Sequence, residues 1–228
     1  MRKNIWGIIL ASGFSKRMGK PKLLLPYKGK PIIRHVIDES MESRLSGVVV
    51  VVNPEVAELR NEVSRSCVSK LVLNEQAGQG MSTSLKAGLM NLPLTADAAV
   101  VLLGDQPLVS SDDIDAVIEC YESNGGPLIV QASYQSKRGH PVLFDCSMFP
   151  HLFNVTGDEG ARSVLKMFSN KICFARIDKP FPSDIDTPED YEQLLRKEVS
   201  NNGFNRKSTF FFRRITRVSQ SDYRSIRA

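Results

Sequence analysis

Short runs of continuously apolar residues are the feature that most constrains the fold of this chain. They cover residues 5–10, 48–52 and 98–103, residues 70–73 predict a further short strand, and a predicted helix follows each of these four strands. Strands without a polar face are typical of parallel sheets that helices cover on both sides. The repeated order of strand and helix therefore predicts an α/β fold with a single Rossmann-like, doubly wound and mostly parallel sheet.

The second half of the chain has a less regular pattern. It predicts strands over 128–133, 141–144 and 172–177, a polar turn over 135–139, and helices over 157–168 and from Pro188 on, capped by Thr187. In the first half, Pro54 predicts the start of a helix that runs to Ser64. Nothing in the pattern indicates a separate second domain, so one domain is expected over residues 1–198.

The positive charge is concentrated at the C-terminus. The whole chain has a formal net charge of +5, but residues 199–228 hold seven Lys and Arg against one Asp, which leaves about −1 for the rest. Residues 199–228 are expected to be a flexible basic extension, and the distribution does not favour a nucleic-acid partner. The chain has no apolar run of membrane-spanning length and no cleavable signal pattern, so a cytoplasmic protein without a membrane partner is expected.

A loop with four cations follows the first apolar run. It covers residues 10–22, with Ser12 and Gly13 at its start and Arg17 and Lys22 among its cations. Ligands of open α/β sheets bind at the carboxyl ends of the strands, where this loop lies. Its spacing fits neither the P-loop nor the dinucleotide fingerprint. The alternatives are an ordinary solvated loop or a polyphosphate site of another pattern.

Acidic residues follow other predicted elements at the same sheet edge. Asp105 comes directly after the apolar run 98–103, and Asp186 precedes the predicted cap Thr187, with Asp184 as a nearby competitor. Mg²⁺ is commonly held by one or two carboxylates together with phosphate oxygens. Asp105 could instead be a turn residue, and the later acids could be helix caps.

Three further polar segments are candidate parts of a binding site. Residues 74–82, with Asn74, Gly80 and Ser82, have the amides and small residues that suit a nucleobase and its ribose. Residues 138–141 combine a cation with an imidazole and could bind an anionic substrate or form a surface turn. Residues 157–162 offer backbone donors to an anion.

Together these motifs resemble the molybdenum cofactor cytidylyltransferase family, within the MobA-like NTP transferase superfamily. The resemblance extends from residue 5 to about 198. It rests on Leu10-Ala11-Ser12-Gly13, Arg17-Met18-Gly19, Lys22, Gly104-Asp105-Gln106-Pro107, Arg138-Gly139-His140-Pro141, Gly157-Asp158-Glu159-Gly160-Ala161-Arg162 and Asp184-Ile185-Asp186-Thr187-Pro188.

The resemblance implies a fold of the nucleotide-diphospho-sugar transferase type and a role for each motif residue. Nucleotide-binding roles are implied for Leu10, Ala11, Ser12, Gly13, Arg17, Lys22, Asn74, Gly80 and Ser82. Arg17 and Lys22 are also expected to neutralise the leaving phosphates, and Asp105 and Asp186 to hold the cofactor Mg²⁺, so that Arg17, Lys22 and Asp105 form the catalytic set. Arg138, Gly139, His140 and Pro141 are expected to face a pterin substrate.

The implied reaction is transfer of CMP from CTP to the terminal phosphate of molybdopterin, with release of pyrophosphate. The recipient molybdoenzyme is a further implied partner. Ser12 departs from the family pattern, in which cytidylyl transferases usually have Ala and guanylyl transferases Gly at this position. GTP is therefore an alternative to CTP. Separate alternatives are another phosphorylated acceptor, such as a sugar phosphate, and a non-catalytic nucleotide-binding module.

Overall fold

The computed structural model describes residues 3–201. The chain divides into a large unit that ends at Asp186 and a C-terminal unit that begins at Thr187. The expected basic extension over 199–228 lies almost entirely outside the described residues, so its flexibility and the predicted boundary at residue 198 remain predictions.

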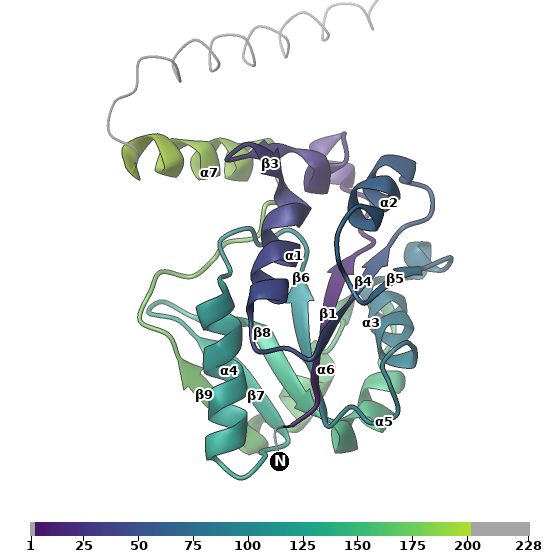
Figure 1. Ribbon diagram of the computed structural model, residues 1–228, viewed down its shortest axis with the longest axis vertical. Helices are drawn as coiled ribbons and strands as arrows, with labels where there is room; N and C mark the ends of the chain where they lie inside the picture. Colours follow the sequence, from purple (N-terminus) through teal and green to yellow (C-terminus); the bar gives the residue numbers. More distant parts are fainter. Residues whose placement is uncertain (1–2, 202–228) are drawn as a thin grey trace, which may run out of the picture. The chain divides into compact units, whose positions relative to one another are not determined.

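A seven-stranded sheet forms the centre of the large unit (Figure 1). Its strands, in sequence order, are β1 (Ile5–Ala11), β4 (Gly47–Val52), β5 (Lys70–Leu73), β6 (Ala98–Leu103), β7 (Ile129–Ser133), β8 (Arg138–Asp145) and β9 (Ile172–Arg176). In space the order is β5-β4-β1-β6-β8-β7-β9, and β8 alone among these seven runs against its neighbours. The predicted doubly wound, mostly parallel sheet is confirmed.

Helices cover both faces of this sheet (Figure 1). The helices of the large unit are α1 (Ile32–Glu42), α2 (Ala57–Ser64), α3 (Met81–Met90), α4 (Ser111–Ser123), α5 (Phe149–Phe153) and α6 (Arg162–Met167). Helices α1 and α4 pack on one face, and α3, α5 and α6 share a core cluster on the other. The small antiparallel pair β2 (Pro26–Tyr27) and β3 (Lys30–Pro31) precedes α1.

The apolar strands are buried as their composition predicts. Every residue of β4 is buried, and β1 and β6 are nearly so, because helices exclude water from both faces. Gly88 allows α3 to lie close to the sheet, since a Cβ there would come within 2.4 Å of the Ile8 side chain. Strands β1 and β6 are parallel neighbours in this core, so their carboxyl ends lie side by side.

The segment around residue 140 differs from the prediction. The expected polar turn is present over residues 134–137, where the Tyr134 N–H donates to the Lys137 carbonyl, but the strand expected over 141–144 is longer: β8 already begins at Arg138 and contains a cis His140–Pro141 peptide bond. Since β8 inserts between β6 and β7, its partners are two strands that precede it in the chain. Local sequence periodicity carries no information about that pairing.

Two predicted helix boundaries are wrong. Helix α2 begins at Ala57 rather than Pro54, because the Asn53 side chain accepts a hydrogen bond from the Glu55 N–H at 2.9 Å and stabilises a turn there. The helix expected over 157–168 is divided into a short 3₁₀ turn and α6, because Gly160 has a left-handed φ of +54°.

The C-terminal unit contains α7 (Pro188–Asn201), which starts where the sequence predicts. Its cap is reciprocal: the Thr187 hydroxyl accepts from the Asp190 N–H at 3.2 Å, and the Asp190 carboxylate accepts from the Thr187 N–H at 2.8 Å. None of the helices within residues 3–201 has the length and apolar character needed to cross a lipid bilayer.

Candidate functional site

A cavity of about 520 Å³ opens at the carboxyl ends of β1 and β6. It is lined by Leu10, Ala11, Ser12, Gly13, Phe14, Ser15, Arg17, Lys22, Leu23, Ala77, Gly78, Gly80, Met81, Ser84, Leu103, Asp105, Asp158, Arg162, Asp184 and Asp186. The loop 10–22, the segment 74–82 and the two acidic segments, which lie far apart in the sequence, therefore share one cavity. Most of the residues singled out in the sequence are brought together there.

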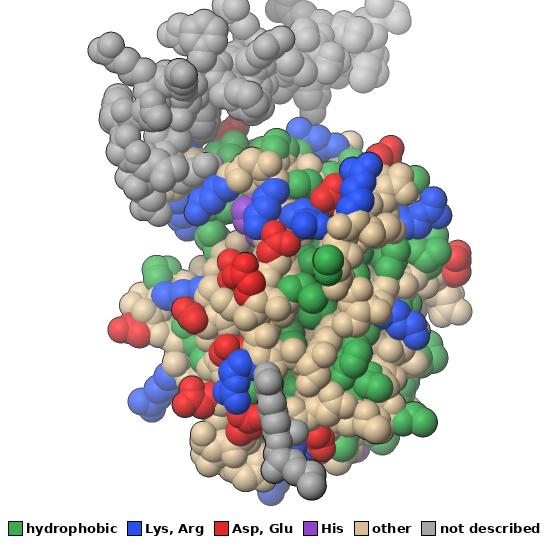
Figure 2. Space-filling model, in the orientation of Figure 1, with side chains coloured by type: hydrophobic (Ala, Val, Ile, Leu, Met, Phe, Trp, Pro, Cys, Tyr) green, Lys and Arg blue, Asp and Glu red, His purple; other side chains and the backbone are tan. Residues whose placement is uncertain are grey.

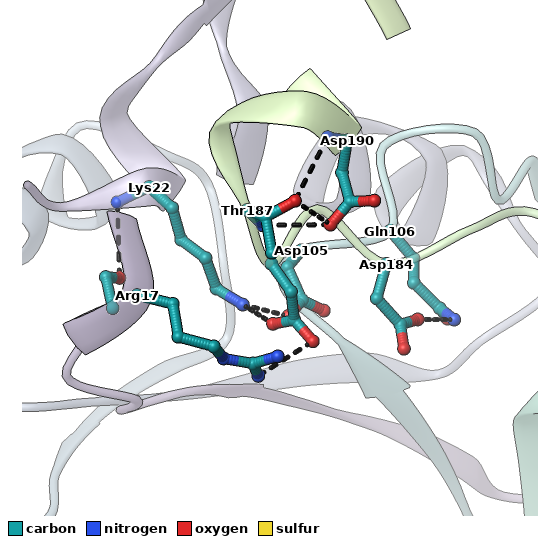
Figure 3. Close-up of polar contacts among 9 residues, drawn as sticks. Arg17, Lys22, Asp105, Gln106, Asp184, Thr187 and Asp190 are labelled. Carbon is teal, nitrogen blue, oxygen red and sulfur yellow. Dashed lines mark hydrogen bonds and ion pairs between the residues drawn. The ribbon is translucent and has the colours of Figure 1, made fainter. Parts of the chain in front are cut away.

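Lys22 lies between two carboxylates at the polar end of the cavity (Figure 3). Its Nζ is 2.5 Å from Oδ2 of Asp105 and 2.7 Å from Oδ1 of Asp186. Arg17 reaches the other oxygen of Asp186 at 3.0 Å. The two predicted cations and the two predicted acids thus form one ion-pair network across three chain segments.

Burial and charge shift the pKa values within this network. Burial acts to lower the pKa of Lys22, but the two carboxylates outweigh it, and this pKa is raised. Burial raises the pKa of Asp105 against the opposing effect of Lys22. Burial also acts to raise the pKa of Asp186, but Lys22 and Arg17 outweigh it and hold this pKa below its usual value. Of these three groups, Asp105 has the pKa that is shifted against its charged form. Its ionisation therefore depends most on a nearby cation.

The segment that carries Asp186 is fixed to the turn after β6. The Ile185 N–H donates to the Asp105 carbonyl at 3.0 Å, and Nε2 of Gln106 donates to the Asp184 carboxylate at 2.5 Å (Figure 3). Gln106 is almost completely buried. These contacts bring Asp186 beside Asp105, as the position of both acids at one sheet edge predicted.

The two acids fit a divalent cation. Oδ1 of Asp105 is buried and has no hydrogen-bond partner among the described residues, so its lone pairs are available. Within residues 3–201 no cluster of three or more His, Cys, Asp or Glu side chains could hold a metal by itself. Mg²⁺ needs no such cluster, because it completes its shell with water and phosphate oxygens.

A buried polar network supports the opposite wall. Ser12, with 5% of its surface exposed, makes a hydrogen bond to the Ser84 hydroxyl. Nδ2 of Asn74 donates to the same hydroxyl at 3.0 Å and to Thr83 at 2.9 Å. Asn74 therefore orients Ser84 and does not itself line the cavity. Ser82, also expected at the nucleotide, is buried in α3 and likewise does not line it.

Gly80 allows two loops to approach each other at this wall. It has a φ of +104°, and a Cβ at this position would come within 2.5 Å of the Gly157 backbone. Both the conformation and the contact require glycine. Glycine at position 80 therefore allows the 74–82 segment to pack directly against the 157–160 turn.

Replacing Gly80 by Ala is expected to weaken nucleotide binding and to lower the midpoint of thermal unfolding, because strain at such a position costs about 1–3 kcal/mol. Gly78→Ala is the matched control, since Gly78 lines the same cavity and a Cβ there would meet nothing within 4 Å. Calorimetric titration with CTP and a thermal melt measure both effects. Equal behaviour of the two variants would contradict the assigned role of Gly80.

The segment 138–141 does not line the cavity. The Arg138 guanidinium stacks on the Phe174 ring at 3.9 Å, and a Cβ on Gly139 would collide with the Phe181 ring. Nδ1 of His140 donates to the Val101 carbonyl at 3.1 Å, and burial lowers the pKa of this imidazole. Pro141 continues β8. The structure thus gives these residues packing contacts outside this cavity, and their expected position facing a pterin substrate stays a prediction.

The lining residues that were not singled out individually from the sequence include Ser84, Asp158 and Arg162. Ser84 lies in an apolar helix, where a small polar residue is commonly a packing residue. Asp158 and Arg162 belong to the segment 157–162, for which the sequence predicted backbone donors only. The Arg162 side chain was missed because a helix continuous from residue 157 was expected in place of the turn that Gly160 forms.

The charges around the cavity suit a polyphosphate with a bound cation. Figure 2 shows Lys and Arg side chains gathered toward the end of the molecule at which the parallel strands end, with acidic side chains beside them. Arg17 and Lys22 offer cationic donors, and the backbone of loop 10–15 lies at the carboxyl end of a buried strand. The lining contains no Cys or His, and the site can bind and polarise phosphates without a side-chain nucleophile.

Known proteins of similar sequence indicate the family of this chain. A family model, "MobA-like NTP transferase domain", matches residues 7–173. The purine catabolism protein PucB of Bacillus subtilis is 32% identical over 83% of this chain and 95% of its own length. The nicotine blue oxidoreductase of Paenarthrobacter nicotinovorans is 28% identical over 84% of this chain and 96% of its own length.

Among solved structures, an Rv0371c homologue from Mycobacterium sp. strain JC1 superposes with a TM-score of 0.78 at 28% identity, over 88% of this chain and 99% of that one. This similarity confirms the predicted fold, in which a mostly parallel sheet lies between helical layers. With the family match over most of the chain, it assigns the activity class of nucleotidyl transfer. The chain belongs to the MobA-like NTP transferase family.

Proposed function

We propose that this protein is a Mg²⁺-dependent cytidylyltransferase that transfers CMP from CTP to the terminal phosphate of molybdopterin or its metal-loaded form, releasing pyrophosphate. One observation carries the proposal: Arg17, Lys22, Asp105 and Asp186 converge on a single cavity at the carboxyl ends of β1 and β6. This set combines two cations for a leaving pyrophosphate with two carboxylates for a metal ion.

The chain's own residues would act by position and charge. Arg17 and Lys22 would neutralise the β- and γ-phosphates of CTP as the bond to the α-phosphorus breaks. Asp105 and Asp186 would hold Mg²⁺, which supplies charge stabilisation at the phosphates when bound. The acceptor phosphate is already ionised at neutral pH, so no general base is required. Catalysis then rests on alignment of the two phosphates.

Ser12 supports a pyrimidine base. Its buried side chain is held by Ser84, which Asn74 orients in turn, so the hydroxymethyl group occupies a fixed volume beside loop 10–13. Glycine at position 12 would leave that volume open to a larger base. A side chain of Ala or Ser size therefore favours cytosine over guanine.

The acceptor is proposed from the resemblance of the five motifs to the molybdenum cofactor cytidylyltransferases. The test incubates the full chain with Mg²⁺, molybdopterin and either CTP or GTP, and measures pyrophosphate and the mass of the dinucleotide product. Product with CTP at a rate at least about tenfold above that with GTP is expected, a difference of about 1.4 kcal/mol in activation free energy. Pyrophosphate with neither nucleotide would contradict the proposal and leave a nucleotide-binding module.

Replacing Ser12 by Gly is expected to shift the preference toward GTP. The reason is the space freed beside the base, and one misfitting group in a binding pocket changes discrimination by about 10- to 200-fold. The ratio of kcat/KM for GTP to that for CTP measures the shift. Ser15→Gly, which changes another serine of the same lining, is the control. An unchanged ratio in Ser12→Gly would show that another residue selects the base.

A further inference from the structure

Three cationic side chains line the cavity, and they differ in their partners. Arg17 pairs with Asp186, and Lys22 pairs with both Asp105 and Asp186. Arg162 makes no ion pair with any other residue in the range 3–201, although the acidic Asp158 lines the same cavity. Within the described residues, no carboxylate therefore neutralises the Arg162 charge through an ion pair, although Arg162 lines the cavity.

Arg162 and the predicted metal acid Asp105 line the same cavity. The charges of Asp105, at the end of β6, and of Arg162 both act on the buried imidazole of His140 in β8. Ser12, which directly follows β1, and Ser84 in α3 form the predicted base side, whereas Arg162 is the first residue of α6.

The turn before Arg162 is built to fix this position. Gly157 and Gly160 both have left-handed φ values, +65° and +54°. A Cβ on Gly160 would come within 2.8 Å of the Met81 sulfur, so this turn packs directly against the start of α3. Val164, two residues further along α6, is buried in the core cluster. Arg162 is therefore exposed to the cavity from an anchored segment of the chain.

We infer that Arg162 binds the phosphate of the acceptor, a phosphate monoester, and aligns it for attack on the α-phosphorus. This inference rests on the proposed function and deepens it. It also gives the acceptor a cation that Arg138 does not supply, because Arg138 is stacked on Phe174 outside the cavity lining.

The chemistry calls for such a cation. A phosphate nucleophile that approaches a bound triphosphate meets strong like-charge repulsion, and Arg17 and Lys22 are placed at the acids and the leaving group. A guanidinium can donate two parallel hydrogen bonds to one phosphate and so fixes its orientation as well as its charge. Arg162 would form these bonds with the acceptor and leave one oxygen directed at the α-phosphorus. That oxygen forms the new P–O bond as the bond to pyrophosphate breaks.

The test compares Arg162→Met with Lys166→Met, which removes one exposed cation from the same helix outside the cavity. Arg162→Met is expected to raise the KM for the phosphorylated acceptor by about 10- to 100-fold, as for the loss of a charged hydrogen-bond pair. The dissociation constant for CTP, measured by calorimetry with Mg²⁺ present, is expected to change less than about twofold. Arg162→Lys, with a point charge and no planar fork, should recover part of the acceptor KM.

Lys166→Met is expected to match the wild type in both measurements, and a thermal melt of each variant checks that it is folded. An acceptor KM in Arg162→Met equal to that of the wild type would overturn the inference. An equal loss of CTP affinity would also overturn it, because Arg162 would then bind the nucleotide. If the wild type transfers CMP to another phosphate monoester and not to molybdopterin, the proposed acceptor fails, and the same comparison with that monoester still decides the role of Arg162.

Discussion

Replacing Asp105 by Asn is expected to lower pyrophosphate release from CTP by at least about 10²- to 10³-fold, the loss typical when one preorganised electrostatic group is removed from a transition state. The amide keeps the shape of the side chain but loses the negative charge that a divalent cation requires. Burial already raises the pKa of Asp105. The ionised carboxylate is therefore unfavourable in this position unless a cation lies beside it.

Asp184→Asn is the matched control for this experiment. Asp184 lines the same cavity, but one of its oxygens is bound by Gln106 at 2.5 Å, and no Lys22 contact reaches it. Its loss is expected to cost less than about tenfold, in the range of a single hydrogen bond. Initial rates of pyrophosphate release at saturating Mg²⁺, CTP and acceptor measure both variants. A rate in Asp105→Asn close to that of the wild type, or a larger loss of rate in Asp184→Asn than in Asp105→Asn, would show that Asp105 is not the residue that holds the metal ion.

Replacing Lys22 by Met is expected to lower kcat by about 10²- to 10³-fold, because a cation aligned with the leaving phosphates is removed. It is also expected to destabilise the folded protein by on the order of 3 kcal/mol, as for other buried ion pairs that lose one partner. The Lys22 side chain is only 12% exposed and Asp105 only 19%, so water replaces little of the lost interaction.

The loss of stability in Lys22→Met should depend on pH in a defined direction. The pKa of Asp105 is raised, so its ionisation destabilises the folded state as pH rises through that pKa, and Lys22 offsets part of this effect. The pKa of Asp186 is lowered, so its pairing stabilises the protein at neutral pH, and this contribution is lost as pH falls through its folded value. Both effects make the deficit of the variant largest near neutral pH.

Urea unfolding of wild type and Lys22→Met in EDTA, at about pH 7.5 and about pH 4.5, measures this dependence. The difference in unfolding free energy is expected to shrink at the lower pH because Asp105, whose pKa is raised, takes up a proton, while the Asp186 contribution is lost only at still lower pH, below its own lowered pKa. Lys20→Met, which removes an exposed cation of the same loop, should show no such change between the two pH values. A constant deficit across pH would mean that Lys22 stabilises the protein through its aliphatic chain alone.

The sequence predicted the part of the site that follows from strand direction. Residues 5–10 and 98–103 are too apolar for any position but a covered parallel sheet, and residues after two such strands must meet at one edge. Loop 10–22 and Asp105 were placed correctly for that reason. Asp186 follows the same logic, although the hydrogen bond from Ile185 to Asp105 that fixes it could not be inferred from any local pattern.

The remaining site residues depend on tertiary pairing. Arg138 and His140 were expected beside a substrate because their residue types suit one. Because β8 inserts between β6 and β7, these two side chains make packing contacts outside the cavity lining, and their role toward a substrate stays a prediction. Arg162 was concealed by a helix pattern that Gly160 interrupts through its left-handed backbone. Ser84 was missed because its partner Ser12 lies 72 residues away.

The most direct test of the central claim follows the fate of each phosphorus of CTP. The full chain, with Mg²⁺ and the phosphorylated acceptor, is given CTP labelled with ³²P at the α- or at the γ-position. Attack at the α-phosphorus predicts that the α-label appears in the acceptor product and the γ-label in pyrophosphate. Transfer of the γ-label to the acceptor, or retention of both labels in CTP, would contradict the account.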